Sequence, residues 1–102
     1  MNNSLTHFFI ICFQTEGDEE ARIEQKCWCG YTDSFADAED SVLKNRNDIH
    51  ETVYQWAVIE EYYMSAYALP TDFIQWYHWS DEANAYSRCD TPKWAKYIIR
   101  WV

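Results

Sequence analysis

Hydrophobic and polar positions predict a β-hairpin in the first third of the chain. Residues 6–14 are mostly apolar or aromatic and end in an acidic turn at residues 16–20, as expected for a buried strand followed by a loop. Residues 21–31 then alternate, so that one face of a second strand would carry Ile23, Gln25, Cys27 and Cys29. We therefore expect two neighbouring strands that pair as a hairpin.

The periodicity then changes to that of a helix. Apolar residues recur at helical spacing over residues 35–43, after a polar stretch at residues 32–34 that offers several N-cap side chains. Carboxylates occupy the first turns, whereas Lys44 and Arg46 fall in the last turn, so both ends complement the helix dipole. We expect an amphipathic helix that closes at residues 45–48.

The segment from residue 52 to residue 64 fits two patterns. Its β-branched and aromatic residues favour a strand, whereas Ile49, Val53 and Trp56 also belong to a helical stripe. We interpret the segment as a strand because Val, Ile, Tyr and Trp dominate it and Pro70 follows soon after.

The remainder of the chain predicts two further strands and a second helix. An aromatic strand covers residues 73–79, a hairpin loop covers residues 80–84, and a last strand covers residues 85–89. The Thr91-Pro92 pair supplies an N-cap and a first helical residue for a helix that runs to the C-terminus. The order β-β-α-β-β-β-α predicts an α+β fold, a single domain over residues 1–102 with an antiparallel sheet of about five strands and two helices.

Charge is distributed unevenly along this fold. The chain has 17 acidic and 8 basic residues and a net charge of −9 at pH 7. Residues 16–82 hold sixteen of the acids and four bases, whereas residues 83–102 hold one acid and four bases. Binding to nucleic acid depends on Lys and Arg that neutralise phosphates, so we expect no direct nucleic-acid binding.

The sequence also indicates where the protein functions. Residues 6–13 are apolar, but no basic residue precedes them as in an export signal, and no stretch reaches the ~18–20 apolar residues of a membrane span. We expect a cytoplasmic protein that contacts no membrane. In a reducing compartment its four cysteines, Cys12, Cys27, Cys29 and Cys89, would be free thiols.

Cys27 and Cys29 form the first candidate site. Two cysteines separated by one residue on a strand share a face, so both sulfurs could bind one structural Zn²⁺. One hairpin register would place His7 opposite Cys29 as a third ligand, with a fourth from His78, His50 or Cys89. A register shifted by one residue would instead bring Cys12 to the face of Cys27 and remove His7 from it. The alternative interpretation is that the cysteines are small core residues and that the protein has no cofactor.

Catalytic motifs are missing from the sequence. It contains no nucleophile elbow, no zinc-protease helix motif and no phosphate-binding loop, and it has only two glycines. An enzyme that used Cys27 or Cys29 would need a cleft beside one of the sulfurs. We therefore expect a protein that is not an enzyme.

Carboxylates and aromatic rings form the second candidate site, a surface for a protein partner. The expected acids lie in the first loop and on the first helix: Glu16, Asp18, Glu19, Glu20, Asp33, Asp37, Glu39 and Asp40. Three of them, Asp33, Asp37 and Asp40, have the spacing of one helix face, about 10 Å from end to end. Large rings are favoured at interfaces, and the expected anchors are Trp76, Tyr77 and Trp79.

In size and charge the chain resembles small acidic inhibitors that phages encode against bacterial defence systems, among them anti-CRISPR proteins and DNA-mimic anti-restriction proteins. The resemblance rests on composition and involves no shared motif. It implies a non-enzymatic inhibitor in the host cytoplasm, bound through its acidic surface to the basic groove of a nucleic-acid-handling protein such as a CRISPR effector or a restriction enzyme.

Overall fold

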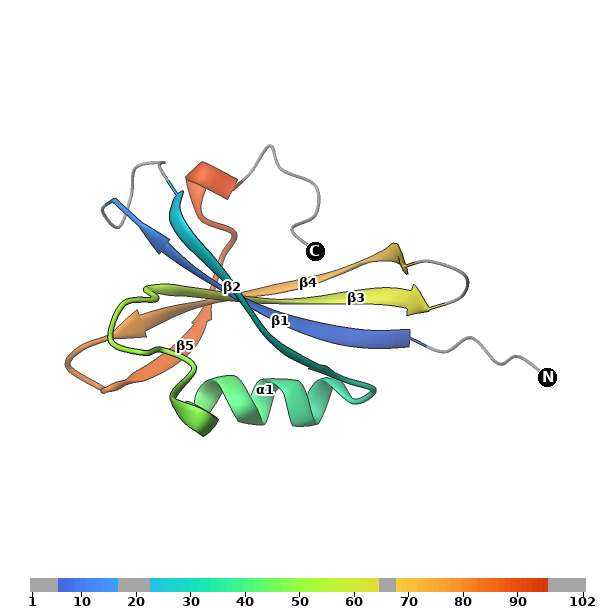
Figure 1. The fold of residues 1–102 in the computed structure, drawn as a ribbon, viewed down its shortest axis with the longest axis horizontal. Helices are drawn as coiled ribbons and strands as arrows, with labels where there is room; N and C mark the ends of the chain where they lie inside the picture. The colour runs from blue at the N-terminus through green and yellow to red at the C-terminus, as the bar shows by residue number, and fades with distance from the viewer. Residues whose placement is uncertain (1–5, 17–22, 65–67, 96–102) are drawn as a thin grey trace.

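Five antiparallel strands form one sheet in the order β2-β1-β3-β4-β5, and a helix packs across one of its faces (Figure 1). This computed structural model describes residues 6–16, 23–64 and 68–95. The strands are β1 (Thr6–Thr15), β2 (Ile23–Thr32), β3 (Trp56–Met64), β4 (Ala68–Ser80) and β5 (Ala85–Cys89). Helix α1 (Phe35–Leu43) and the 3-10 turn η1 (Arg46–Asp48) precede β3, and a second 3-10 turn, η2 (Lys93–Ala95), follows β5.

The predicted α+β class and the five-stranded antiparallel sheet are confirmed, whereas the predicted order β-β-α-β-β-β-α with its two helices is not confirmed. The predicted second helix is not found in the part of the chain that the structure describes. There the chain forms only the 3-10 turn η2, and residues 96–102 of that predicted helix lie outside the described residues.

Strand β4 begins earlier than the sequence predicts. It includes Pro70, which we had expected to precede the strand. Pro70 pairs with Tyr62 of β3 on one side of β4. On the other side β5 pairs only with residues 76–80, so no described strand needs the N–H group that proline lacks. Proline is tolerated at such an unpaired strand edge.

Helix α1 begins where its cap is strongest. The Ser34 hydroxyl oxygen accepts a hydrogen bond from the Asp37 backbone N–H at 3.2 Å, which satisfies one of the unpaired donors of the first turn. One turn apart, Ala38 and Val42 are fully buried against the sheet. The helix therefore presents an apolar stripe to the sheet and its carboxylates to the sides.

The chain returns from α1 to the sheet through a turn with unusual backbone. Five residues that are not glycine have a positive φ between residue 45 and residue 52: Asn45, Asn47, Asp48, Glu51 and Thr52. The Asn45 side chain holds part of this turn, since its oxygen accepts a hydrogen bond from the His50 N–H at 2.9 Å. Because the turn continues to residue 55, β3 begins at Trp56 and not at residue 52 as predicted.

Both faces of the sheet are covered by packed side chains. On the α1 face the buried core contains Ile10, Cys12, Ala38, Val42, Ile49, Tyr54, Ala57, Ile59, Tyr77, Trp79 and Tyr86. On the opposite face it contains Phe9, Ile11, Phe13, Trp56, Val58, Tyr62, Trp76 and Ala95, with Trp94 of η2 packed against it. The central strands are thus buried on both sides. No helix among the described residues has the length and apolar character needed to cross a membrane.

Candidate functional site

Strand β2 lies at an edge of the sheet and contains a β-bulge. Ile10 of β1 pairs with Gly30, and the next residue, Ile11, pairs with Trp28, so Cys29 is an extra residue without a partner on β1. Gly30 has a φ of 150°, a backbone conformation that only glycine adopts without strain. The bulge therefore depends on the glycine at this position.

The bulge brings two aromatic rings to the same face of the sheet. In a regular strand, residues three apart point to opposite faces. Here both Trp28 and Tyr31 contact Phe9, with ring centroids 5.8 and 5.5 Å from the Phe9 ring. Trp28 is 55% exposed and Tyr31 is 65% exposed. They are the two most exposed large apolar side chains in the described part of the chain, and our sequence prediction did not include them.

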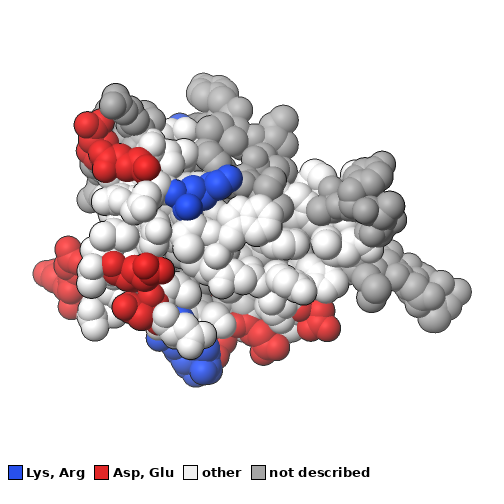
Figure 2. All heavy atoms as spheres, viewed as in Figure 1, with Lys and Arg blue, Asp and Glu red and all other residues white. Residues whose placement is uncertain are grey.

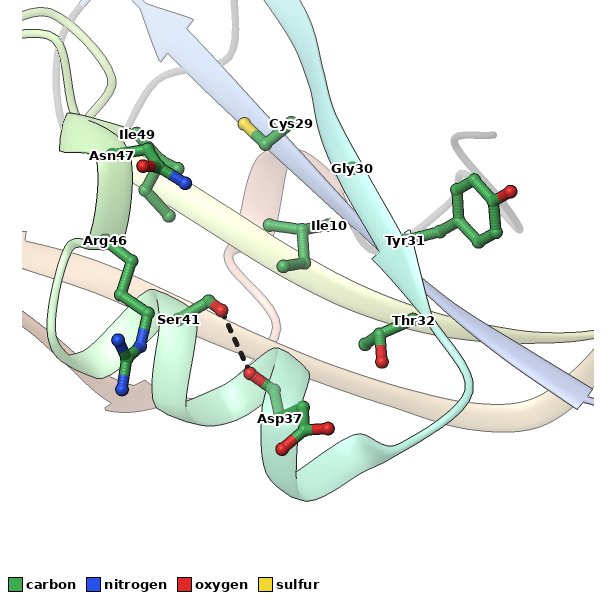
Figure 3. Close-up of a pocket in the computed structure, with 10 residues that line it drawn as sticks. All are labelled: Ile10, Cys29, Gly30, Tyr31, Thr32, Asp37, Ser41, Arg46, Asn47 and Ile49. Carbon is green, nitrogen blue, oxygen red and sulfur yellow. Dashed lines mark hydrogen bonds between the residues drawn. The ribbon is translucent and has the colours of Figure 1, made fainter.

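A pocket of about 180 Å³ lies on the α1 side of the same strand (Figure 3). It is bounded by β2, by α1 and by the turn that follows α1; residues that line it include Cys29, Thr32, Asp37, Ser41, Arg46 and Asn47. Figure 3 shows the Tyr31 ring directed away from the other residues that line the pocket. Cys29 thus has a cleft beside it, and Cys27 is not among the residues that line this cleft.

Ion pairs divide the predicted acids of α1 into two groups. Asp40 binds Lys44 at 3.0 Å and Arg46 at 2.5 Å. The Arg46 guanidinium, together with Lys44, lowers the pKa of Asp40. The charge of Asp40 is therefore already matched within the chain.

Glu39 is matched in the same way by a more distant part of the fold. Its carboxylate accepts hydrogen bonds from Arg88 of β5 at 2.6 and 2.7 Å and from the Tyr77 hydroxyl at 2.6 Å. The Arg88 guanidinium, with help from Tyr77, holds the pKa of Glu39 below its usual value. Burial and the Glu39 carboxylate raise the pKa of Tyr77. Glu39 therefore joins α1 to the sheet and is not free to bind a partner.

Among the predicted acids from residue 33 to residue 40, Asp33 and Asp37 remain available. Both are exposed, and neither forms an ion pair with any other described residue. Asp33 precedes the N-cap Ser34, so it lies at the end of β2 and not on the helix face that we predicted. Glu16 is exposed after β1, whereas Asp18, Glu19 and Glu20 lie outside the described residues. Acidic side chains also gather at one end of the molecule and beside α1 in Figure 2, with basic side chains between them.

The prediction that Trp76, Tyr77 and Trp79 are exposed anchors is wrong. They are 1%, 0% and 9% exposed, respectively. Strand β4 is central and covered on both faces, so every ring along this part of the strand enters one of the two cores. The burial of these rings leaves Trp28 and Tyr31 as the aromatic part of the candidate surface.

The predicted zinc ligands do not come together. Cys27 and Cys29 share the α1 face as expected, and Cys12, which pairs with Cys27, lies on that face too, as in the second arrangement that the sequence allowed. His7 lies on the other face, where its ring is 5.4 Å from that of Tyr31. Ile23 also lies on that face, since a second irregularity in the hairpin separates it from Gln25. Across residues 6–16, 23–64 and 68–95, no three His, Cys, Asp or Glu side chains are grouped so as to hold a metal ion.

The edge strand β2 and the start of α1 define one candidate site, which we call the β2 edge surface. It consists of Trp28 and Tyr31, whose rings pack on Phe9, and of Asp33 and Asp37, which follow β2 directly and in the first turn of α1. Gly30 between two aromatic residues was the signal in the sequence that could have revealed it, because glycine inside a strand marks a bulge.

Comparisons with protein-family models, with curated proteins and with solved structures found no match to this chain. The functional argument therefore depends on the chemistry of the β2 edge surface.

Proposed function

We propose that the protein is a non-enzymatic inhibitor that binds a basic, nucleic-acid-handling protein through the β2 edge surface. One observation supports this above others: Asp33 and Asp37, exposed carboxylates that form no ion pair with another described residue, follow closely after the strand that carries two exposed rings, Trp28 and Tyr31. Carboxylates attract a basic partner, and Trp and Tyr provide the apolar contact area that holds it.

Charge supports the same choice of partner. A net charge of −9 on 102 residues repels nucleic acid and attracts proteins that bind it. Such a partner has a groove lined with Lys and Arg, which the β2 edge surface would occupy in place of phosphates. CRISPR effectors and restriction enzymes are the classes implied by the resemblance to phage-encoded inhibitors, and both operate in the cytoplasm.

The test is capture of partners at two salt concentrations. The immobilised protein is incubated with bacterial lysate, and the bound proteins are identified by mass spectrometry. We expect basic nucleic-acid-binding proteins at about 0.1 M salt and weaker capture at about 1 M, where the Debye length falls from about 10 to about 3 Å. Added duplex DNA should compete, and a captured nuclease should lose activity when the protein is added in purified form.

Charge reversal at the site separates specific recognition from general acidity. Asp33→Lys with Asp37→Lys should greatly reduce capture, mainly through slower association. Asp72→Lys with Glu82→Lys changes the net charge equally at exposed positions on β4 and in the turn that follows it. We expect this control pair to capture the partner nearly as well as the unchanged protein. If both double variants lose capture equally, net charge alone explains the binding and the β2 edge surface is not the recognition site. If neither variant loses capture, the proposal is refuted.

A further inference from the structure

Two cysteine thiols meet at the β2 bulge. The Sγ atoms of Cys12 and Cys29 are 3.2 Å apart and share a hydrogen bond. Cys12 is fully buried in the core beneath α1, whereas Cys29 is partly buried and lines the pocket of about 180 Å³. One sulfur of the pair can therefore be reached by a small molecule, and the other is shielded from it.

The bulge decides which cysteine of β2 meets Cys12. Cys27 is the backbone partner of Cys12, yet its thiol donates to the Trp28 carbonyl oxygen at 3.7 Å. Cys29, the extra residue of the bulge, extends toward Cys12 instead. The hydrogen bond between the two thiols lowers the pKa of Cys29 and raises the pKa of Cys12. The accessible sulfur is thus the one that ionises more readily, and the thiolate is the reactive form of cysteine.

We propose that Cys29 is an oxidisable thiol for peroxide and that Cys12 resolves it, so that oxidation produces a disulfide between β1 and β2. The sulfurs must approach by about 1.2 Å to reach the S–S bond length of about 2.05 Å. This site goes beyond the proposed inhibitory function and does not depend on it.

The reaction is balanced with hydrogen peroxide as the oxidant. The Cys29 thiolate attacks one peroxide oxygen, which gives a sulfenic acid and a hydroxide that takes up the thiol proton and leaves as water. The Cys12 sulfur then attacks the Cys29 sulfur, and its proton leaves with the sulfenic hydroxyl as a second water. Two thiols lose two electrons in total, and these electrons reduce one peroxide to two waters.

The test counts thiols and locates the bond in the folded, reduced protein. After treatment with hydrogen peroxide, the remaining thiols are alkylated, and intact mass is measured. We expect the loss of two alkylatable thiols and of two hydrogen atoms per chain. Fragmentation between Cys27 and Cys29 should place the bond at Cys29 and Cys12.

Three variants make the assignment falsifiable. Cys27→Ser, the matched control on the same face, should form the disulfide as the unchanged protein does. Cys29→Ser should form none, and Cys12→Ala should accumulate a sulfenic acid at Cys29 that dimedone traps. If Cys12→Ala does not fold, the fragment map of the unchanged protein still shows which two cysteines form the disulfide. Two outcomes of the fragment map would overturn the proposal: a disulfide bond through Cys27, or oxidation of Cys89 before Cys29. The proposal would also be wrong if all four thiols of the folded protein persist under conditions that oxidise the urea-unfolded chain.

Discussion

Replacing Trp76 should destabilise the fold far more than replacing Trp28, although the two residues are chemically identical. The Trp76 ring is 1% exposed and lies 5.7 Å from the Phe13 ring and 5.4 Å from the Trp94 ring. A buried Trp removes about 150–250 Å² from water. At about 25 cal/mol per Å² this area corresponds to about 4–6 kcal/mol, close to the ~3–5 kcal/mol typical of Trp→Ala in a core.

Trp28→Ala should cost much less. Trp28 leaves 55% of its surface exposed and packs on one ring, Phe9. The same conversion applied to its buried half gives about 2 kcal/mol, an upper bound because the unfolded chain already buries part of that area. We therefore expect the free energies of unfolding of the two variants to differ by about 2–4 kcal/mol.

Urea unfolding followed by circular dichroism measures both variants. With a slope of about 1–3 kcal/mol per molar urea, the two midpoints should be separated by at least about 0.7 M. If Trp76→Ala leaves no folded baseline, Trp76→Phe retains a ring and should cost about 1–3 kcal/mol. Equal costs at positions 28 and 76 would refute the assignment of Trp76 to the core and of Trp28 to the surface.

Two further predictions concern the backbone and the ion pairs. Gly30→Ala should lower the free energy of unfolding by about 1–3 kcal/mol. The cost would come from backbone strain at a φ of 150° and not from a steric clash, because an added Cβ would meet no atom within 4 Å. A melting temperature unchanged from that of the parent protein would contradict this. Glu39 has its pKa lowered from 4.5 by Arg88 and then by Tyr77, so its stabilisation is present above about pH 4.5 and is lost as pH falls through the lower, folded pKa. Glu39→Gln should therefore be less stable at neutral pH and show a flatter loss of stability in acid, which melting curves at several pH values would measure; parallel pH profiles would exclude the carboxylate as the cause.

The sequence predicted the secondary structure well because most of that signal is local. Apolar runs, alternation, β-branched and aromatic residues and turn residues indicated all five strands, and the polar residues 32–34 before an apolar stripe that includes Ala38 and Val42 indicated the helix. Cys27 and Cys29 share a face as the alternation requires. The 3-10 turn at Lys93–Ala95 shows the limit of this approach, since a cap and a first proline do not fix the helix type that follows.

The candidate site was harder to predict because tertiary contacts decide it. Glu39 is not available to a partner because it binds Arg88, which is 49 residues away in the sequence and on the opposite edge of the sheet from β2. Burial of Tyr77 likewise depends on α1 covering that part of the sheet. Composition can count carboxylates and rings, but it does not show which of them the fold pairs or buries.

The pairing of β1 with β2 was hard to predict because the alternation of a strand does not fix its register. In the structure Cys12 pairs with Cys27, so both lie on the α1 face. His7 is an odd number of residues from Cys12 on β1 and therefore lies on the other face, away from Cys29. The register of the hairpin, and not the bulge, thus removed His7 from the predicted ligand set.

The bulge also has a consequence for recognising relatives of this protein. Residues conserved on one face of a regular strand recur at every second position, but the aromatic pair of β2 is separated by three positions with Gly30 between them. A related sequence that preserves this surface should show two rings at i and i+3 and a glycine at i+2, in the second strand of the hairpin. Loss of the glycine alone would remove the extra residue, restore strict alternation and place the two rings at i and i+2, on the same face of the strand. Such a pair of sequences would align only across a gap, although their surfaces would correspond.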